Sequence, residues 1–215
     1  MDLDESFAAE LREKVHALYA RKVGDVPFHG WHHVKFVSAK ACEFAPELGA
    51  DVLLVYIAAL VHDVNYLIDV RTDASGGSEL RRKILGESGA SDALVDRVER
   101  IVLEAEIQSR TSDISPEAKA LSDGDTLFKA LPVTPVILAP RYMKETGRDL
   151  RELANKIVDE QVPLNDQGIY FYADSARERY RVWAETGLNL WRHILDSLDD
   201  PAIRDLVASV AALEG

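Results

Sequence analysis

Apolar residues recur at steps of three and four along nearly the whole of this 215-residue chain. Phe7, Leu11 and Val15 show the pattern near the start, and a longer stripe repeats it near the end. That stripe is predicted to comprise Tyr180, Trp183, Leu190, Trp191, Ile194 and Leu198. Such spacing places side chains on one face of an α-helix, whereas a half-buried strand alternates every second residue. No stretch alternates in that way, so the sequence predicts an all-α bundle of roughly nine or ten helices.

Capping residues and prolines mark where the predicted helices begin and end. Asp51 is a suitable N-terminal cap for Val52 to Tyr66, a run that is apolar on all sides and is predicted to be the central buried helix. Ser115 followed by Pro116 opens another helix, because proline is tolerated at the first helical position. The remaining predicted helices span 31–45, 78–85, 92–107, 136–144, 150–159 and 174–198, with a last one from Pro201. Pro163 to Tyr172 is predicted to be a loop.

The chain is long enough for one domain, or for one domain with an appendage. A soft boundary lies at Leu131-Pro132, where a predicted helix meets the first of two closely spaced prolines. We therefore divide the chain into a helical core, residues 1–131, and a C-terminal helical extension, residues 132–215. The helices of the extension are strongly one-sided and need a partner surface, so we expect them to pack on the core as part of the same compact unit.

The formal net charge of −12 restricts the partners of the chain. An acidic surface repels a phosphate backbone, which argues against extended nucleic acid, whereas a small phosphorylated ligand needs only a local cation. No apolar run reaches the ~18–20 residues of a membrane helix. Three of the first five residues are acidic, unlike the basic start of a secretory signal, so we expect a cytoplasmic protein with no membrane partner. Cys42 is the one cysteine, which excludes an internal disulfide.

Histidine and aspartate gather in three short segments with apolar flanks. They are His29, His32 and His33 in FHGWHHV, His62 and Asp63 in AALVHDV, and Asp123 and Asp125 in DGDTLFKAL. Imidazole nitrogens and carboxylate oxygens are companion ligands of divalent transition metals, although a lone His or Asp is more often structural or a helix cap. Adjacent residues on a helix point ~100° apart. His62 and Asp63 can therefore share a metal only if it lies between their directions, with further ligands from other helices.

In their order and flanking residues, these segments resemble the motifs of the HD-domain superfamily of metal-dependent phosphohydrolases, across Pro27 to Leu131. The resemblance implies an HD-type helical bundle with additional C-terminal helices packed on it. It also implies a ligand set, which consists of His33, His62, Asp63 and Asp125. His33 precedes a valine, as the family's ligand usually does, and the second Asp of an Asp-x-Asp pair often binds the metal. His32 and Asp123 then remain as alternative ligands or as residues that support the ligands.

The resemblance implies one divalent metal ion as cofactor, with Mn, Mg, Co, Ni, Fe and Zn all compatible. Relatives with two metals carry further histidines between the His-Asp pair and the last Asp, but this chain has none between His62 and His193. This difference counts against the diiron oxygenases and the two-metal cyclic-dinucleotide hydrolases of the superfamily. Glu104 or Glu106 is the alternative source of a second-site ligand, although exposed helix glutamates are common.

The implied activity is hydrolysis of a small phosphorylated molecule, such as a nucleotide or a phosphomonoester, by metal-activated water. A phosphatase, a nucleotidase and a phosphodiesterase all fit. Either Asp63 or Asp125 would orient the attacking water, and Asp63 is the catalytic candidate. By the same resemblance, His29 contacts the phosphate or the leaving group; the alternative is a cap or a core histidine. Lys129, Arg71 and Tyr66 are the candidates for substrate binding.

Two further alternatives remain at this stage. The chain could be a regulatory HD module that binds a nucleotide or another phosphorylated ligand without turnover, because a fold does not determine a function. The intact ligand set favours an enzyme. Trp183 and Trp191, in the long C-terminal helix, either form a homodimer interface or pack within the chain.

Overall fold

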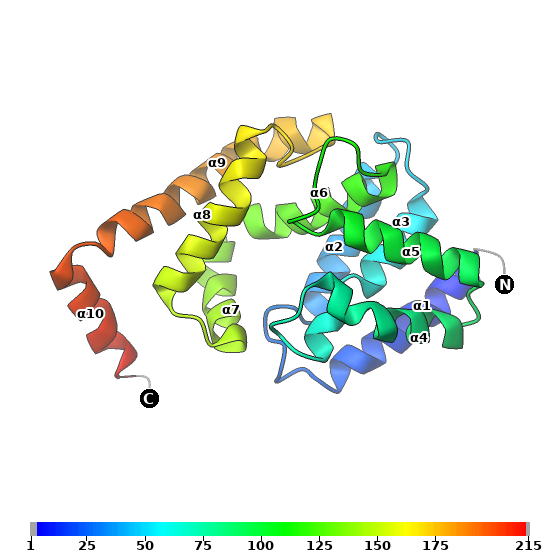
Figure 1. Cartoon of the computed structure of the whole chain (residues 1–215), viewed down its shortest axis with the longest axis horizontal. Helices are drawn as coiled ribbons and strands as arrows, with labels where there is room; N and C mark the ends of the chain where they lie inside the picture. Colours follow the sequence, from blue (N-terminus) through cyan, green and yellow to red (C-terminus); the bar gives the residue numbers. More distant parts are fainter. Residues whose placement is uncertain (1–3, 214–215) are drawn as a thin grey trace.

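The computed structural model describes residues 4–213, so the outermost residues of the predicted core and extension lie outside the described part. Within that range the chain forms ten α-helices and no strand, which confirms the predicted all-α class (Figure 1). They are α1 (Glu5–Ala20), α2 (Trp31–Phe44), α3 (Val52–Val61), α4 (Ser78–Glu87), α5 (Asp92–Ala105), α6 (Pro116–Ala130), α7 (Ala139–Thr146), α8 (Leu150–Asp166), α9 (Asp174–Ser197) and α10 (Pro201–Ala211). The 3-10 turns η1 (Val64–Leu67) and η2 (Ala74–Gly77) and the π-helical turn η3 (Thr134–Leu138) connect some of them. None of the described helices has both the length and the apolarity needed to cross a membrane.

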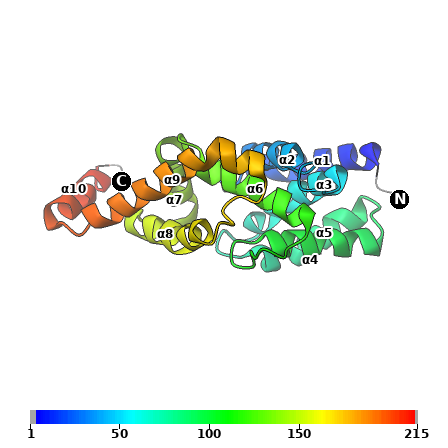
Figure 2. The same cartoon turned by 90° about the horizontal axis from the view of Figure 1, so that it is seen from above.

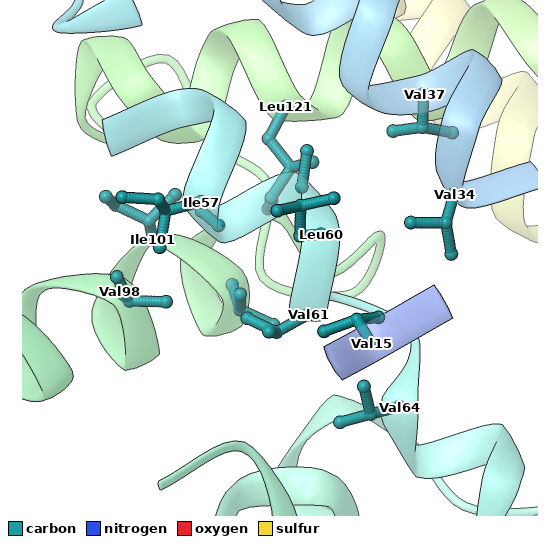
Figure 3. Packing of buried hydrophobic residues seen from close by; sticks show 14 of the residues in the cluster. Val15, Val34, Val37, Ile57, Leu60, Val61, Val64, Val98, Ile101 and Leu121 are labelled. Carbon is teal, nitrogen blue, oxygen red and sulfur yellow. The ribbon is translucent and has the colours of Figure 1, made fainter. Parts of the chain in front are cut away.

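Helix α3 forms the centre of the core, because its sequence is apolar on every side and its buried residues include Leu54 to Val61 apart from Tyr56. Helices α1, α2, α5 and α6 pack around it. Figure 3 shows one residue from each of these helices beside Ile57, Leu60 and Val61 of α3; they are Val15, Val34, Val98 and Leu121. Burial of each such side chain contributes ~1.5–3 kcal/mol to folding.

Side-chain caps fix the starts of two helices that lead to the site. Asp51 accepts hydrogen bonds from the N–H groups of Leu53 and Leu54 at 3.0 and 3.1 Å. Ser115 caps α6 by accepting a hydrogen bond from the N–H of Ala118 at 3.3 Å. Both caps were predicted from the sequence and are confirmed, because a short polar side chain satisfies amide groups that have no partner within the first helical turn.

Helices α2 and α6 approach each other closely at Gly124. A Cβ atom added to Gly124 would lie 2.8 Å from the carbonyl oxygen of Val37 and 2.9 Å from the backbone nitrogen of Ala41. No side chain fits so close to two backbone atoms of the other helix, so the glycine determines how far apart the two helices lie. Asp125 follows Gly124, and His33 is on α2. This contact therefore controls the distance between two of the predicted ligands.

The C-terminal helices extend away from the core, and the molecule is elongated when seen from above (Figure 2). Helices α8 and α9 pack against each other, and α9 also packs on α6. Tyr180, Ala184 and Leu188 of α9 belong to one buried cluster with Phe44 of α2 and Leu127 of α6. Helix α10 has no buried residue. Helix α9 thus packs on the core, while α10 at the far end lies apart from it.

Three predictions for the C-terminal helices need correction. The loop expected from Pro163 does not begin there, since α8 continues through Pro163 to Asp166 and proline removes only one N–H donor. The helix expected over 136–144 begins as an α-helix only at Ala139, because residues 134–138 form the π-helical turn η3. The buried stripe of α9 consists of Ala176, Tyr180, Ala184, Leu188 and Trp191. Trp183 and Leu190 are 39% and 42% exposed. The prediction followed the large apolar residues, whereas two positions of the buried face are occupied by the small residues Ala176 and Ala184.

Candidate metal centre and cleft

Helix α3 ends at Val61, immediately before the His62-Asp63 pair. The sequence predicted that it would continue to Tyr66, but after Asp63 the chain enters the tighter turn η1. Asp63 has φ −105° and ψ 16°, which lies outside the α-helical region. In a continuous helix the two side chains would point ~100° apart. The break brings Asp63 Oδ2 to 3.2 Å from His62 Nε2, so both residues can face one ligand.

His33 completes a cluster of three potential ligand atoms. Its Nε2 lies 3.2 Å from His62 Nε2 and 2.9 Å from Asp63 Oδ2, and all three atoms lie within 4.8 Å of one another. His33 comes from α2 and the other two residues from the end of α3, which packs against α2. Both histidines are buried and Asp63 is partly exposed. The cluster is therefore held rigidly on the histidine side and is accessible on the aspartate side.

The chemistry of this cluster fits a divalent cation. His62 Nδ1 lies 2.8 Å from the carbonyl oxygen of Ala59 and donates to it, so a neutral His62 presents the lone pair of Nε2 to the cluster. Burial lowers the pKa of His33, which favours its neutral, ligating form. Burial alone would raise the pKa of Asp63, but His62 and His33 hold it well below its usual range. The 3.2 Å between the two Nε2 atoms is close to the spacing of two ligands each roughly 2.1 Å from one ion.

Asp125 lies at the edge of this cluster. Its Oδ1 is 3.6 Å from His33 Nε2, and its Oδ2 is 2.6 Å from Lys129 Nζ and 3.5 Å from Arg110 Nη2. Burial raises the pKa of Asp125, but Lys129, His33 and Arg110 outweigh it and bring the pKa to about 2. An ionised oxygen thus faces His33, as a fourth ligand requires. The role of Asp125 as that ligand stays a prediction.

The two alternative ligands, His32 and Asp123, lie elsewhere. His32 is exposed, its ring centroid lies 6.3 Å from that of Phe128, and it is not among the clustered residues of the described chain. Asp123 is completely buried, and its two oxygens accept hydrogen bonds from the N–H groups of Tyr172 and Ala173 at 2.8 and 2.7 Å. Residues two apart on a helix point ~200° apart. Asp123 therefore holds the start of α9, while Asp125 faces His33.

The candidate substrate-binding residues are divided in the same way. Tyr66 lines the cleft described below, and its ring stacks on His29 with centroids 3.6 Å apart. Lys129 also lines the cleft. Arg71 does not, since its side chain is 84% exposed and its partner is Asp69 on the same loop. The structure therefore brings Lys129, Tyr66 and His29 to the candidate site and leaves Arg71 outside it.

Glu104 and Glu106, the alternatives for a second metal site, have different surroundings. Glu104 Oε2 accepts a hydrogen bond from the backbone N–H of Ser115 at 3.0 Å and is also bonded to its hydroxyl group, so it supports the start of α6. Glu106 lines the cleft and accepts a hydrogen bond from the N–H of Ala74 at 3.3 Å. Burial raises the pKa of Glu106. Neither residue joins the metal-ligand cluster found among residues 4–213.

A cleft of about 270 Å³ connects the ligand cluster with the C-terminal helices. Charged residues in its lining include Asp63, Asp125 and Lys129 beside the cluster and Lys156 and Glu160 of α8. Apolar residues of α8 and α9 line another part, including Leu153, Ile157, Leu188 and Trp191. Trp191 is 4% exposed and packs with α7 and α8 of its own chain. Sequence reasoning did not find this wall, because the extension carries no motif and its one-sided helices indicated only that it packs on something.

Comparisons with known proteins found one matching family model and several solved structures with the same fold. A family model described as HD domain matches residues 30–129, which include all four predicted metal ligands. A search of curated proteins found no match. Among solved structures, Bacillus subtilis YpgQ in complex with ADP superposes with a TM-score of 0.60 at 23% identity, covering 91% of this chain and 99% of that one. Because 91% of this chain is covered, the shared fold extends beyond residues 30–129.

Two further structures show the same fold. A Lactobacillus plantarum protein has a TM-score of 0.67 at 17% identity and covers 92% of this chain and 97% of its own. The Lin1889 protein of Listeria innocua has a TM-score of 0.58 at 17% identity, with 93% and 97% covered. At these identities the likeness concerns the arrangement of helices alone.

Proposed function

The chain belongs to the HD-domain superfamily of metal-dependent phosphohydrolases, and we propose that it hydrolyses a small phosphorylated molecule such as a nucleotide or a phosphomonoester. The observation that carries the proposal is the convergence of His33, His62 and Asp63 within 4.8 Å, with Asp63 lining a cleft. Two buried imidazoles and a carboxylate are a ligand set that suits a catalytic divalent ion with open positions.

His33, His62, Asp63 and Asp125 would hold one ion of Mn, Mg, Co, Ni, Fe or Zn. When bound, such an ion lowers the pKa of a coordinated water molecule and offsets negative charge on a phosphoryl oxygen. The accessible carboxylate of Asp63 orients the attacking water. Lys129 contributes positive charge beside Asp125, at the same part of the cleft.

The residues that line the cleft favour an organic phosphate as substrate over inorganic phosphate alone. The apolar part beside Leu153, Ile157 and Trp191 would receive the organic group, while the phosphoryl group lies beside the metal ligands. Binding sites for small molecules combine an apolar lining with a few placed polar groups in this way. YpgQ, whose structure was solved with ADP, makes a nucleoside diphosphate the first substrate to test.

The test is a phosphate-release screen after elemental analysis of the purified chain, using the metal found and a panel of ADP, other nucleotides and phosphomonoesters. We expect metal-dependent release from at least one member of the panel. Asp63→Ala should lower the rate more than ~100-fold, because even partners of metal ligands contribute ~10–100-fold. His32→Ala is the matched control, since it removes a neighbouring histidine outside the cluster.

Two outcomes would contradict the proposal. Full activity and full metal content in Asp63→Ala would show that the ligands are assigned wrongly. Binding of ADP without release of phosphate from any substrate would favour the regulatory module that binds without turnover. Circular dichroism of each variant shows whether the fold is retained.

A further inference from the structure

Glu145 of α7 is buried against the segment that precedes α2, and its side chain has no exposed surface. Its Oε2 accepts hydrogen bonds from the backbone N–H groups of Phe28 and His29 at 2.7 and 3.1 Å. Its Oε1 is paired with His29 Nδ1. These contacts join residues more than a hundred positions apart in the sequence. A carboxylate of the extension thus holds a histidine of the core with two hydrogen bonds and the residue before it with a third.

Two tyrosine rings also pack against the His29 ring. Tyr66 stacks on it at an interplanar angle of 10°, and Tyr142 lies edge-on with centroids 5.8 Å apart. Tyr142 and Glu145 are three residues apart on α7 and therefore share one side of that helix. Both contact the same ring, so α7 positions His29 by packing and by hydrogen bonding together.

The hydrogen bond determines which ring nitrogen remains for a ligand. Burial raises the pKa of Glu145, but the hydrogen bonds from His29 and Phe28 bring it below its usual range, so Glu145 is ionised. An ionised carboxylate only accepts, and His29 Nδ1 must therefore carry the proton that it shares. Nε2 then has no hydrogen-bond partner among residues 4–213. His29 lines the same cleft as His62 and Asp63.

We propose that Glu145 is a positioning residue, which holds His29 so that its Nε2 hydrogen-bonds a phosphoryl oxygen of the substrate beside the metal ligands. Because Nδ1 is paired with Glu145, Nε2 is the ring nitrogen that remains to meet the phosphoryl group. The inference rests on the proposed function and extends it to the extension, because α7 supplies the residue that completes the substrate side of the site.

The test is a double-mutant cycle of Glu145→Gln and His29→Ala, with kcat and KM measured on the substrate that the screen identifies. Loss of an orienting partner should lower kcat ~10–100-fold in Glu145→Gln. The double variant should be no slower than His29→Ala, because residues that act as a unit are not additive. The matched control is Glu185→Gln, which makes the same charge change on α9 of the extension, where the carboxylate pairs with Arg181 and does not line the cleft. It should keep kcat near that of the wild type.

A purely structural role gives a different pattern. If folded Glu145→Gln keeps the wild-type kcat, or if its loss multiplies with that of His29→Ala, the proposal is overturned. Should Glu145→Gln not fold, Glu145→Asp keeps the charge but withdraws it by one methylene group, and unchanged kcat in that variant would overturn the proposal equally.

A second readout does not depend on turnover. In nitrogen-15 spectra of the histidine rings, wild-type His29 should carry a proton on Nδ1, and its Nε2 resonance should shift when ADP is added. The ADP-dependent shift should be lost in Glu145→Gln and kept in Glu185→Gln. Absence of phosphate release from the wild type would refute the proposed function alone. An Nε2 shift that persists in Glu145→Gln would refute the positioning role alone.

Discussion

The core around α3 and the C-terminal helices α7 to α10 differ in how deeply their residues are buried. Most residues of α3 are buried, whereas α10 has no buried residue. The ion pair Arg81–Glu99 of the core is 0% and 7% exposed, while Lys156–Glu160 of α8 is 32% and 23% exposed. Metal ligands require positions fixed by dense packing, but a cleft wall needs only one well-packed face. Metal binding should therefore depend on the core, and substrate binding should depend on the extension.

The same substitution in the two ion pairs should give the largest contrast. Glu99→Gln leaves Arg81 completely buried without its charged partner, and breaking a buried pair costs ~3–5 kcal/mol of unfolding free energy. Glu160→Gln breaks a pair that water reaches on α8, where such pairs contribute only ~0.3–0.5 kcal/mol. Urea unfolding of both variants measures the difference. Equal losses in the two variants would remove the basis of the comparison.

A pair of glycines tests whether the core determines the spacing of the ligands. Gly124→Ala must separate α2 from α6, and overpacking of this kind costs ~1–3 kcal/mol. It should also weaken metal binding, since it moves Asp125 relative to His33. Gly86 of α4 has nothing within 4 Å of an added Cβ, so Gly86→Ala should stabilise the chain by ~0.5–1 kcal/mol and leave metal affinity unchanged. Similar metal affinities in both variants would contradict the role given to Gly124.

Asp123 links the two regions, and its replacement should have a smaller effect. In Asp123→Asn one oxygen acceptor replaces two, so one N–H at the start of α9 loses its partner at a cost of ~1–3 kcal/mol. Thermal melting and urea unfolding of the variant and the wild type measure the loss of unfolding free energy. We expect it to be accompanied by a weaker affinity for ADP and by unchanged metal content.

The same variant has a pH dependence of definite sign. Burial raises the pKa of Asp123 to about 7. A carboxyl group whose pKa is higher in the folded state binds more protons there, so its contribution to stability falls as pH rises from about 4 to about 7. The advantage of the wild type over Asp123→Asn should therefore be larger at about pH 5.5 than at about pH 7.5. An equal advantage at both values would show that Asp123 is ionised throughout.

Features that depend on residues close together in the sequence could be predicted from the sequence. The caps Asp51 and Ser115 were predictable, because capping depends on the amide groups of the next turn. The choice of His33 over His32 came from its resemblance to family motifs, and the structure brings His33 to the cluster. The end of α3 at Val61 was missed, since an apolar run gives no sign that the helix breaks before the His62-Asp63 pair.

Features that depend on distant contacts were not predictable. Asp123 was considered as a ligand, but its partners Tyr172 and Ala173 are about fifty residues later in the sequence. Glu145 was not considered at all, because its partner His29 lies in the other region of the chain. In both cases no sequence motif contains the residue together with its hydrogen-bond partners. Only the fold, which brings α7 and α9 back to the core, makes these pairs visible.

The most direct test of the account is metal titration of the chain after treatment with a chelator. Isothermal titration with Mn²⁺ and elemental analysis should both give about one ion per chain for the wild type, and less than about a tenth of an ion for Asp63→Ala. Asp69→Ala, which removes an exposed aspartate from the nearby loop, should still bind one ion. A wild type that binds no ion, or an Asp63→Ala variant that binds as well as the wild type, would contradict the assignment of the metal centre.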